Sequence, residues 1–239
     1  MDGGRAPRYS LGDMIAEREA TLATSDGVAL EARLALPAAP AGGVVICHPH
    51  PLYGGDMDNP VVVRVAEVCR ELEFATLRFN FRGVGASTGN HGHGRDERHD
   101  LIAALGHLAS VLSTGTPLGL AGYSFGAAMT PHLVTDPTGF PPLAALLLIA
   151  PPLVMMGDTP LVALARLGIP ITVVAGDHDE YCSVAALEAL QRRIPAATIK
   201  IIDGANHFFF GKLYPLGQAV AAWARVLEAR QARRGGRPG

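Results

Sequence analysis

Short apolar runs rich in β-branched residues alternate with longer stretches of helical periodicity along most of this chain. Strands that are apolar on both faces must be covered on both faces, and the intervening helices can provide that cover. The apolar runs predict strands at 43–48, 75–80, 118–123, 145–150, 171–175 and 198–202. The periodic stretches predict helices at 59–72, 95–112, directly after residue 124, at 183–193 and at 213–230. We therefore expect an α/β fold with a mostly parallel sheet and helices on both of its faces.

The N-terminal region follows a different pattern. Residues 20–23 and 29–36 form two strand-like segments around an Asp26-Gly27 turn, which predicts an antiparallel hairpin at one edge of the sheet. The hairpin brings the expected sheet to about eight strands. Because no long polar linker or repeat interrupts the 239 residues, we expect one domain over residues 1–239. Residues 1 to about 15 and 230–239 are predicted to be poorly ordered tails.

The composition limits the classes of partner and compartment. With 49% hydrophobic and 18% charged residues and a formal net charge of −2, the chain lacks the basic excess typical of nucleic-acid binding. Its longest apolar run, 143–150, is far shorter than the roughly 20 residues that span a bilayer. Residues 1–10 contain no apolar signal segment, and the three cysteines show no paired spacing. We expect a cytoplasmic protein without membrane or nucleic-acid partners, and a homodimer is compatible with these features.

The sequence Gly122-Tyr-Ser124-Phe-Gly126 stands directly after a predicted strand and directly before a predicted helix. This is the setting of a nucleophile elbow, in which a tight turn presents the serine at the carboxyl end of the sheet. A second Gly-x-Ser-x-Gly, Gly85-Ala-Ser87-Thr-Gly89, is followed by Gly and His rather than by a helix. We therefore predict Ser124 as a nucleophile and Ser87 as a loop residue at the mouth of the site.

A serine nucleophile needs an adjacent base, and the base needs an orienting carboxylate. His207 follows the last predicted strand, where the fold places its base. The loop after the strand ending at residue 175 contains Asp177 and Asp179. We favour Asp179 as the acid because it lies further into the loop and can turn toward His207. Asp177 would then cap backbone N–H groups of that loop.

Two backbone N–H groups are needed to stabilise an oxyanion. One is expected from Phe125, the residue after the nucleophile, and the other from the loop that follows the strand at 43–48. Proline has no N–H, so Pro49 and Pro51 cannot donate. His50 is our first choice for the second donor, and Leu52 is the alternative.

The remaining histidines suggest a metal site, because imidazole is a common zinc ligand. However, His91 and His93 lie in a glycine-rich loop without a helical pair or an obvious carboxylate partner. The chain also lacks a phosphate loop and a Gly-x-Gly-x-x-Gly sequence. We therefore expect no metal and no cofactor, and we derive no role for the loop from His91 to His99.

Five segments of the chain together resemble a known family: His48-Pro-His-Pro-Leu-Tyr-Gly-Gly55, Asn80-Phe-Arg-Gly-Val-Gly-Ala-Ser87, Gly122-Tyr-Ser-Phe-Gly126, Gly176-Asp-His-Asp-Glu180 and Asn206-His-Phe-Phe209. They are similar to the small bacterial α/β hydrolases of the dienelactone-hydrolase-like and serine-aminopeptidase-like group, many of which are predicted esterases. The resemblance covers roughly residues 20–228. It implies the α/β-hydrolase fold and a triad of Ser124, Asp179 and His207. Dienelactone hydrolases proper use a cysteine nucleophile, and this chain differs in having Ser124.

Only 20 residues, 151–170, separate the sixth predicted strand from the strand before the acid. They suffice for a short helix at 161–167, so we expect a minimal cap and an open cleft. The side chains expected to line an apolar acyl pocket are those of Leu52, Tyr53, Met155, Met156 and Phe208.

These features predict a carboxylesterase-like serine hydrolase that cleaves small, mainly apolar esters through an acyl-enzyme. Three alternatives remain: an amidase or peptidase with the same triad, a non-catalytic binding protein on a hydrolase fold, and a metal-dependent hydrolase.

Overall fold

A computed structural model of the protein describes residues 15–135 and 139–235, and its eight described strands form one sheet. The strands are β1 (Arg18–Ala23), β2 (Ala29–Ala35), β3 (Gly43–Cys47), β4 (Ala75–Phe79), β5 (Leu118–Tyr123), β6 (Ala145–Ile149), β7 (Ile171–Gly176) and β8 (Thr198–Ile202). Their order across the sheet is β1-β2-β4-β3-β5-β6-β7-β8.

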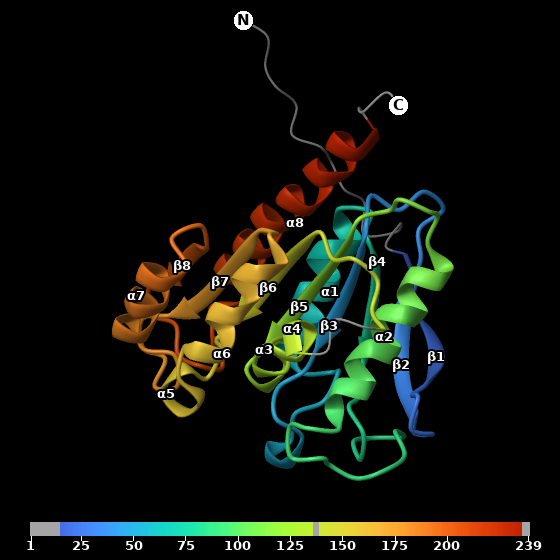
Figure 1. The fold of residues 1–239 in the computed structure, drawn as a ribbon, viewed down its shortest axis with the longest axis horizontal. Coiled ribbons are helices and arrows are strands. Elements are labelled where there is room, and N and C mark those ends of the chain that lie inside the picture. Colours follow the sequence, from blue (N-terminus) through green and yellow to red (C-terminus); the bar gives the residue numbers. More distant parts are fainter. Residues whose placement is uncertain (1–14, 136–138, 236–239) are drawn as a thin grey trace, which may run out of the picture.

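The sheet is parallel from β4 to β8 and antiparallel at its N-terminal edge. β1 pairs with β2, and β2 pairs with β4, in antiparallel register, whereas β3 to β8 pair in parallel. Figure 1 shows β1 and β2 at one edge and β8 at the other. The predicted fold class, with about eight strands and an antiparallel N-terminal edge, is confirmed.

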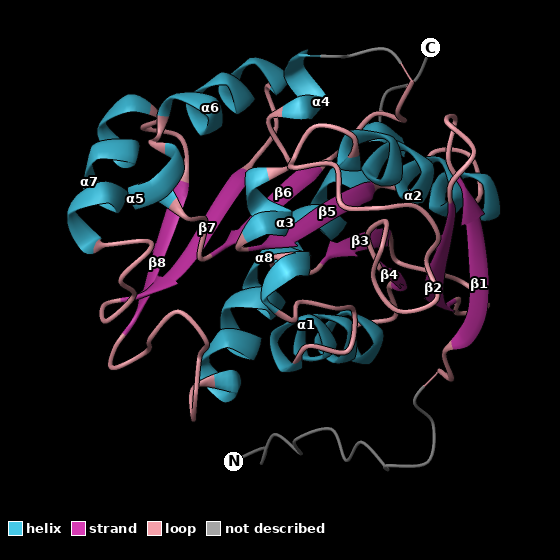
Figure 2. Cartoon of the chain, turned by 90° about the horizontal axis from the view of Figure 1, so that it is seen from below, coloured by secondary structure: helices cyan, strands magenta, loops and turns pink. Residues whose placement is uncertain are grey.

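Helices cover both faces of the sheet (Figure 2). α1 (Pro60–Glu71) and α8 (Leu213–Gly235) lie on one face, and α2 (Glu97–Val111), α6 (Thr159–Val162) and α7 (Val184–Arg193) lie on the other. Each face has its own apolar core. Trp223 of α8 belongs to one core, and Leu101, Leu105 and Leu108 of α2 belong to the other.

Two helical regions differ from the sequence prediction. The helix after Ser124 consists of two short pieces, α3 (Phe125–Ala128) and α4 (His132–Thr135). Pro131 separates them because a proline disfavours helical backbone in the residue before it and lacks an N–H. α8 continues to Gly235, five residues past its predicted end, so this part of the predicted tail is helical. The predicted tails at 1–14 and 236–239 lie outside the described residues.

The segment between β6 and β7 contains only short helices. α5 (Leu153–Met156), which the sequence pattern did not indicate, precedes α6, and a 3-10 helix η2 (Ala163–Leu167) follows. The predicted helix at 161–167 is therefore the end of α6 joined to η2. Among the described helices, none has the length and apolar character needed to cross a membrane.

Candidate active site

Ser124 occupies a strained turn between β5 and α3. Its backbone has φ of 52° and ψ of −109°, a region that side-chain-bearing residues rarely adopt. Gly122 and Gly126, on either side of the serine, are required because other backbone atoms approach their Cα atoms too closely for a Cβ. A Cβ at Gly122 would lie 2.5 Å from the Gly126 carbonyl carbon, and a Cβ at Gly126 would lie 2.5 Å from the Cys47 oxygen. The turn therefore has the geometry of a nucleophile elbow.

His207 lies in the loop after β8, with Nε2 3.0 Å from the Ser124 Oγ. The Tyr123 hydroxyl donates a hydrogen bond to the His207 carbonyl oxygen at 2.9 Å. Burial, together with the nearby charge of Asp179, raises the pKa of Tyr123, so its hydroxyl stays protonated and remains a donor. Tyr123, the residue before the serine, thus holds the loop that carries the His207 imidazole.

Asp179 completes a continuous hydrogen-bonded series. Both of its carboxylate oxygens lie 2.9 Å from His207 Nδ1, and its side chain is fully buried. The backbone N–H groups of Tyr181 and Cys182 donate to Oδ1, each at 2.9 Å. These donors stabilise the ionised carboxylate and fix its direction.

The expected capping role of Asp177 is wrong. Its Oδ1 is buried and has no hydrogen-bond partner among the described residues. Asp179 itself accepts the loop N–H groups that Asp177 was expected to cap. The loop turns between the two residues, and the Asp179 N–H donates to the Gly176 carbonyl oxygen at 3.3 Å.

Ser87, the serine of the second Gly-x-Ser-x-Gly sequence, forms hydrogen bonds that hold its own loop in place. Its hydroxyl donates to the Asn80 carbonyl oxygen at 2.7 Å and accepts the Glu31 N–H at 2.9 Å. It is buried rather than exposed at a site entrance. Ser87 therefore ties its loop to β2 and to the end of β4, and it is a buried loop residue rather than one exposed at the mouth of the site.

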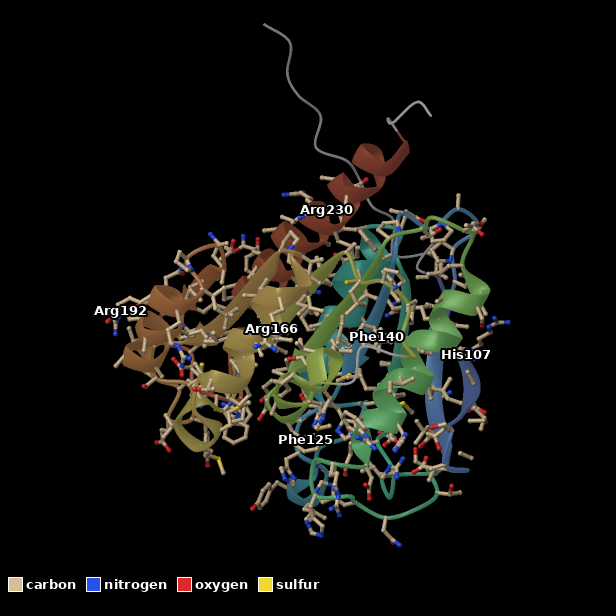
Figure 3. The ribbon with its side chains drawn as sticks, in the orientation of Figure 1. His107, Phe125, Phe140, Arg166, Arg192 and Arg230 are labelled. Carbon is tan, nitrogen blue, oxygen red and sulfur yellow. The ribbon has the colours of Figure 1, made fainter. Side chains whose placement is uncertain are left out.

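The two residues expected to supply oxyanion donors lie side by side. The Gly126 N–H donates to the His48 carbonyl oxygen at 3.1 Å, which joins the elbow to the loop after β3. The rings of His50 and Phe125 are 4.9 Å apart. Neither backbone N–H has a hydrogen-bond acceptor within the described part of the chain. Figure 3 places Phe125 at the end of the sheet that carries these loops.

The alternative donor, Leu52, is already engaged. Its N–H donates to Nδ1 of the His50 ring at 3.2 Å, at the start of the 3-10 helix η1 (Pro51–Tyr53). Burial, with the neighbouring His91 as the next cause, lowers the pKa of His50. A neutral His50 can keep Nδ1 as an acceptor. The geometry thus favours His50 over Leu52 as the second candidate donor.

Four of the five side chains predicted to line the substrate pocket are more than half exposed: Leu52, Tyr53, Met155 and Phe208. The fifth, Met156, is partly buried and packs against the apolar core. The Tyr53 ring packs 4.8 Å from His50, and the Phe208 ring lies 5.5 Å from His207. α5, which carries Met155, is joined to the acid loop by a hydrogen bond from the Val154 N–H to the Tyr181 carbonyl oxygen.

Two further aromatic side chains were missed by the sequence analysis. The Tyr181 ring lies 4.7 Å from His207, and Phe210 stacks on Phe208 at 5.5 Å. Both are exposed. Their positions two residues after Asp179 and three after His207 were the available signal, because loops that carry reacting groups also line the site.

The structure places a carboxylate next to His91 that was not obvious from the sequence. Glu97, whose side chain is fully buried, places Oε1 2.7 Å from His91 Nδ1. Among the described residues, no group of three or more His, Cys, Asp or Glu side chains is arranged to hold a metal ion.

The buried side chain of His48 is expected to make the stability of the protein depend on pH. Burial lowers the pKa of His48 to about 4 from 6.5, and its Nε2 accepts the Phe81 N–H at 2.9 Å. The unfolded chain therefore binds a proton that the folded chain does not between these two pH values. This contribution to the free energy of unfolding is present above pH 6.5 and is lost as the pH falls toward 4, up to about 3 kcal/mol.

Urea unfolding at pH 7 and pH 4.5 measures this effect. A His48→Gln variant is the control, because an amide oxygen can accept the Phe81 N–H but does not titrate in this range. We expect a smaller pH-dependent loss in the variant than in the wild type, and equal losses in the two proteins would contradict the assignment to His48.

Comparison with known proteins adds family relationships to this geometry. A family model described as an alpha/beta hydrolase domain matches residues 44–222, which include Ser124, Asp179 and His207. An uncharacterised protein of Rickettsia prowazekii is 32% identical over 207 residues, covering 84% of this chain and 86% of its own length.

Two solved structures are similar over most of the chain. An alpha-beta serine hydrolase homologue from Coxiella burnetii is 32% identical with a TM-score of 0.73, over 86% of this chain and 96% of its own. A serine hydrolase without lid from Xanthomonas campestris is 29% identical with a TM-score of 0.75, over 92% of this chain and 97% of its own.

Proposed function

Because the chain belongs to the α/β-hydrolase family, we propose that it is a serine hydrolase that cleaves small, mainly apolar carboxylic esters. The observation that carries this proposal is the hydrogen-bonded series from Asp179 through His207 to the Ser124 Oγ. A hydroxyl near neutral pH becomes an effective nucleophile when such a base is adjacent and correctly oriented. The similar serine hydrolase homologue from Coxiella burnetii and the similar serine hydrolase from Xanthomonas campestris support the reaction class.

In the proposed reaction, Ser124 Oγ bonds to the ester carbonyl carbon while His207 Nε2 takes the hydroxyl proton. The carbonyl oxygen becomes an oxyanion that accepts hydrogen bonds from the backbone N–H groups of Phe125 and His50. Asp179 stays ionised, holds the Nδ1 proton and stabilises the imidazolium. These residues thus lower the energy of the tetrahedral intermediate.

Collapse of the intermediate breaks the bond to the alcohol oxygen, which receives the proton from His207. The acyl group remains on Ser124. A water molecule then loses a proton to His207 and attacks the acyl carbon, and the second intermediate releases the carboxylic acid. The proton returns to Ser124, so the enzyme ends in its starting state.

The exposed apolar side chains beside the triad support a mainly apolar acyl group. Tyr181 and Phe208 contact the His207 ring, and Leu52, Tyr53 and Met155 stand exposed on the neighbouring loop and helix. We propose that these residues bind the acyl or alcohol part of the substrate. No charged side chain contacts His207 other than Asp179 among the described residues.

A series of p-nitrophenyl esters from acetate to laurate tests the proposed function. Each fully buried methylene contributes about 0.8 kcal/mol. Because the side chains of the proposed lining are exposed rather than enclosed, we expect kcat/KM to rise over the first few carbons and then to level off. A continuous rise to laurate would contradict the proposed preference for small esters.

The matched p-nitroanilides and a fluorophosphonate probe separate the other outcomes. We expect faster cleavage of each ester than of its anilide, and covalent labelling of Ser124. Preference for the anilides would indicate an amidase, whereas absence of both turnover and labelling would indicate a binding protein.

A further inference from the structure

The loop between β4 and α2 returns to the carboxyl end of the sheet and contacts both candidate oxyanion donors. The His91 ring lies 5.1 Å from the His50 ring and 5.7 Å from the Phe125 ring. His50 and Phe125 are themselves 4.9 Å apart. The three rings therefore contact one another, although they come from three segments far apart in the sequence.

Glu97, the first residue of α2, holds the backbone next to His91 from the protein interior. The carboxylate is fully buried and accepts the backbone N–H groups of Gly92 at 2.7 Å and Gly94 at 2.9 Å. Its Oε1 also lies 2.7 Å from His91 Nδ1, at ion-pair distance but without the alignment of a hydrogen bond. A carboxylate in the first turn of a helix is further stabilised by the helix dipole. Glu97 thus fixes the backbone of the loop directly after His91.

The backbone of this loop also has positive φ angles, which are unfavourable for a residue with a side chain such as His93. His93 has φ of 55°, and Gly94 has φ of 78°. His132 of α4 places Nε2 2.9 Å from the Gly94 carbonyl oxygen. Strained backbone persists where its surroundings determine it strongly. Two helices, α2 and α4, therefore fix the loop that presents His91.

We propose that His91 is a positioning residue for the oxyanion hole. Its ring supports His50 and Phe125, so that their backbone N–H groups remain directed at the place where negative charge develops. This inference rests on the proposed serine hydrolase function. Donors fixed in this way act mainly on the transition state, so their displacement lowers kcat more than it raises KM.

A His91→Gln variant tests the proposal. Glutamine keeps a polar side chain of similar length, but it lacks the ring that contacts His50 and Phe125. We expect kcat for the best ester to fall about 10- to 100-fold, with KM changed less than about twofold. Affinity for an alkylboronic acid, which forms a tetrahedral adduct on the serine, should fall by a similar factor. The affinity for the product acid should not change.

Two further variants separate positioning from a general structural effect. His91→Phe keeps a ring at this position, and we expect it to retain kcat within about threefold of the wild type. His93→Asn removes a ring that contacts His91 at 5.3 Å but neither candidate donor, and asparagine tolerates positive φ. We expect wild-type kinetics for this control.

Several results would overturn the proposal. They are wild-type kcat and boronic acid affinity in His91→Gln, an equal loss in His93→Asn, or an equal loss in a folded His91→Phe. Should His91→Gln fail to fold, His91→Phe still decides, because its loss of kcat contradicts the proposal. A wild type that neither cleaves an ester nor reacts with a fluorophosphonate overturns the proposed function and this inference with it. An active wild type with an equally active His91→Gln variant overturns the inference alone.

Discussion

Replacement of Ser124 by alanine is expected to lower kcat/KM for the best ester by about 10⁶-fold, because the group that forms the acyl-enzyme is removed. The methyl group fits the same turn, and the hydroxyl makes no described hydrogen bond other than that with His207. The free energy of unfolding should therefore change little. Ester hydrolysis and urea unfolding of the same preparations measure both quantities, and fluorophosphonate labelling should disappear with the activity.

Ser87→Ala is the matched control, since it alters the serine of the other Gly-x-Ser-x-Gly sequence. In contrast to Ser124→Ala, this variant should lose stability and keep its activity. Its hydroxyl links the Glu31 N–H to the Asn80 carbonyl oxygen, and loss of the buried hydrogen bonds should cost about 1–3 kcal/mol of stability. Activity should stay within a few-fold of the wild type. Retained turnover in Ser124→Ala would refute the serine mechanism, and loss of activity in a folded Ser87→Ala would require another role for that loop.

The three residues of the candidate triad illustrate what the sequence could predict. Ser124, Asp179 and His207 each follow a strand whose apolar run was visible in the sequence. The carboxyl ends of parallel strands meet at one edge, so the juxtaposition of these side chains followed from the fold. The hydrogen bonds at 2.9–3.0 Å required the structure, because loop conformation sets them.

The loop containing His91 shows why other parts of the site could not be predicted. His91 lies before the predicted helix that contains Glu97, in a stretch without helical or strand periodicity, and His50 lies about 40 positions earlier. Their proximity depends on positive φ angles at His93 and Gly94. No regular pattern of side chains records such backbone turns. The same limitation applied to Ser87, whose buried hydrogen bonds to β2 and β4 depend on a folded loop.

The choice between Asp177 and Asp179 could be argued but not decided from the sequence, since both residues lie in the loop after β7. Asp179→Asn is expected to lower kcat/KM by about 10⁴-fold, as an amide cannot hold the His207 tautomer that leaves Nε2 free to accept the serine proton. KM should change far less than kcat. The two N–H groups of Tyr181 and Cys182 can still donate to the amide oxygen, so the loop should keep its conformation.

Asp177→Asn provides the matched comparison, because the same chemical change is made two residues away in the same loop. The Asp177 carboxylate makes no described contact with His207, and its Oδ1 lacks a hydrogen-bond partner among the described residues. We expect kcat/KM within about threefold of the wild type, together with little change in stability, since the substitution breaks no described hydrogen bond of Oδ1. Ester kinetics and urea unfolding of both variants decide the assignment. A large loss in Asp177→Asn with near-normal activity in Asp179→Asn would exchange the roles of the two carboxylates, whereas equal small losses would show that His207 acts without an orienting acid.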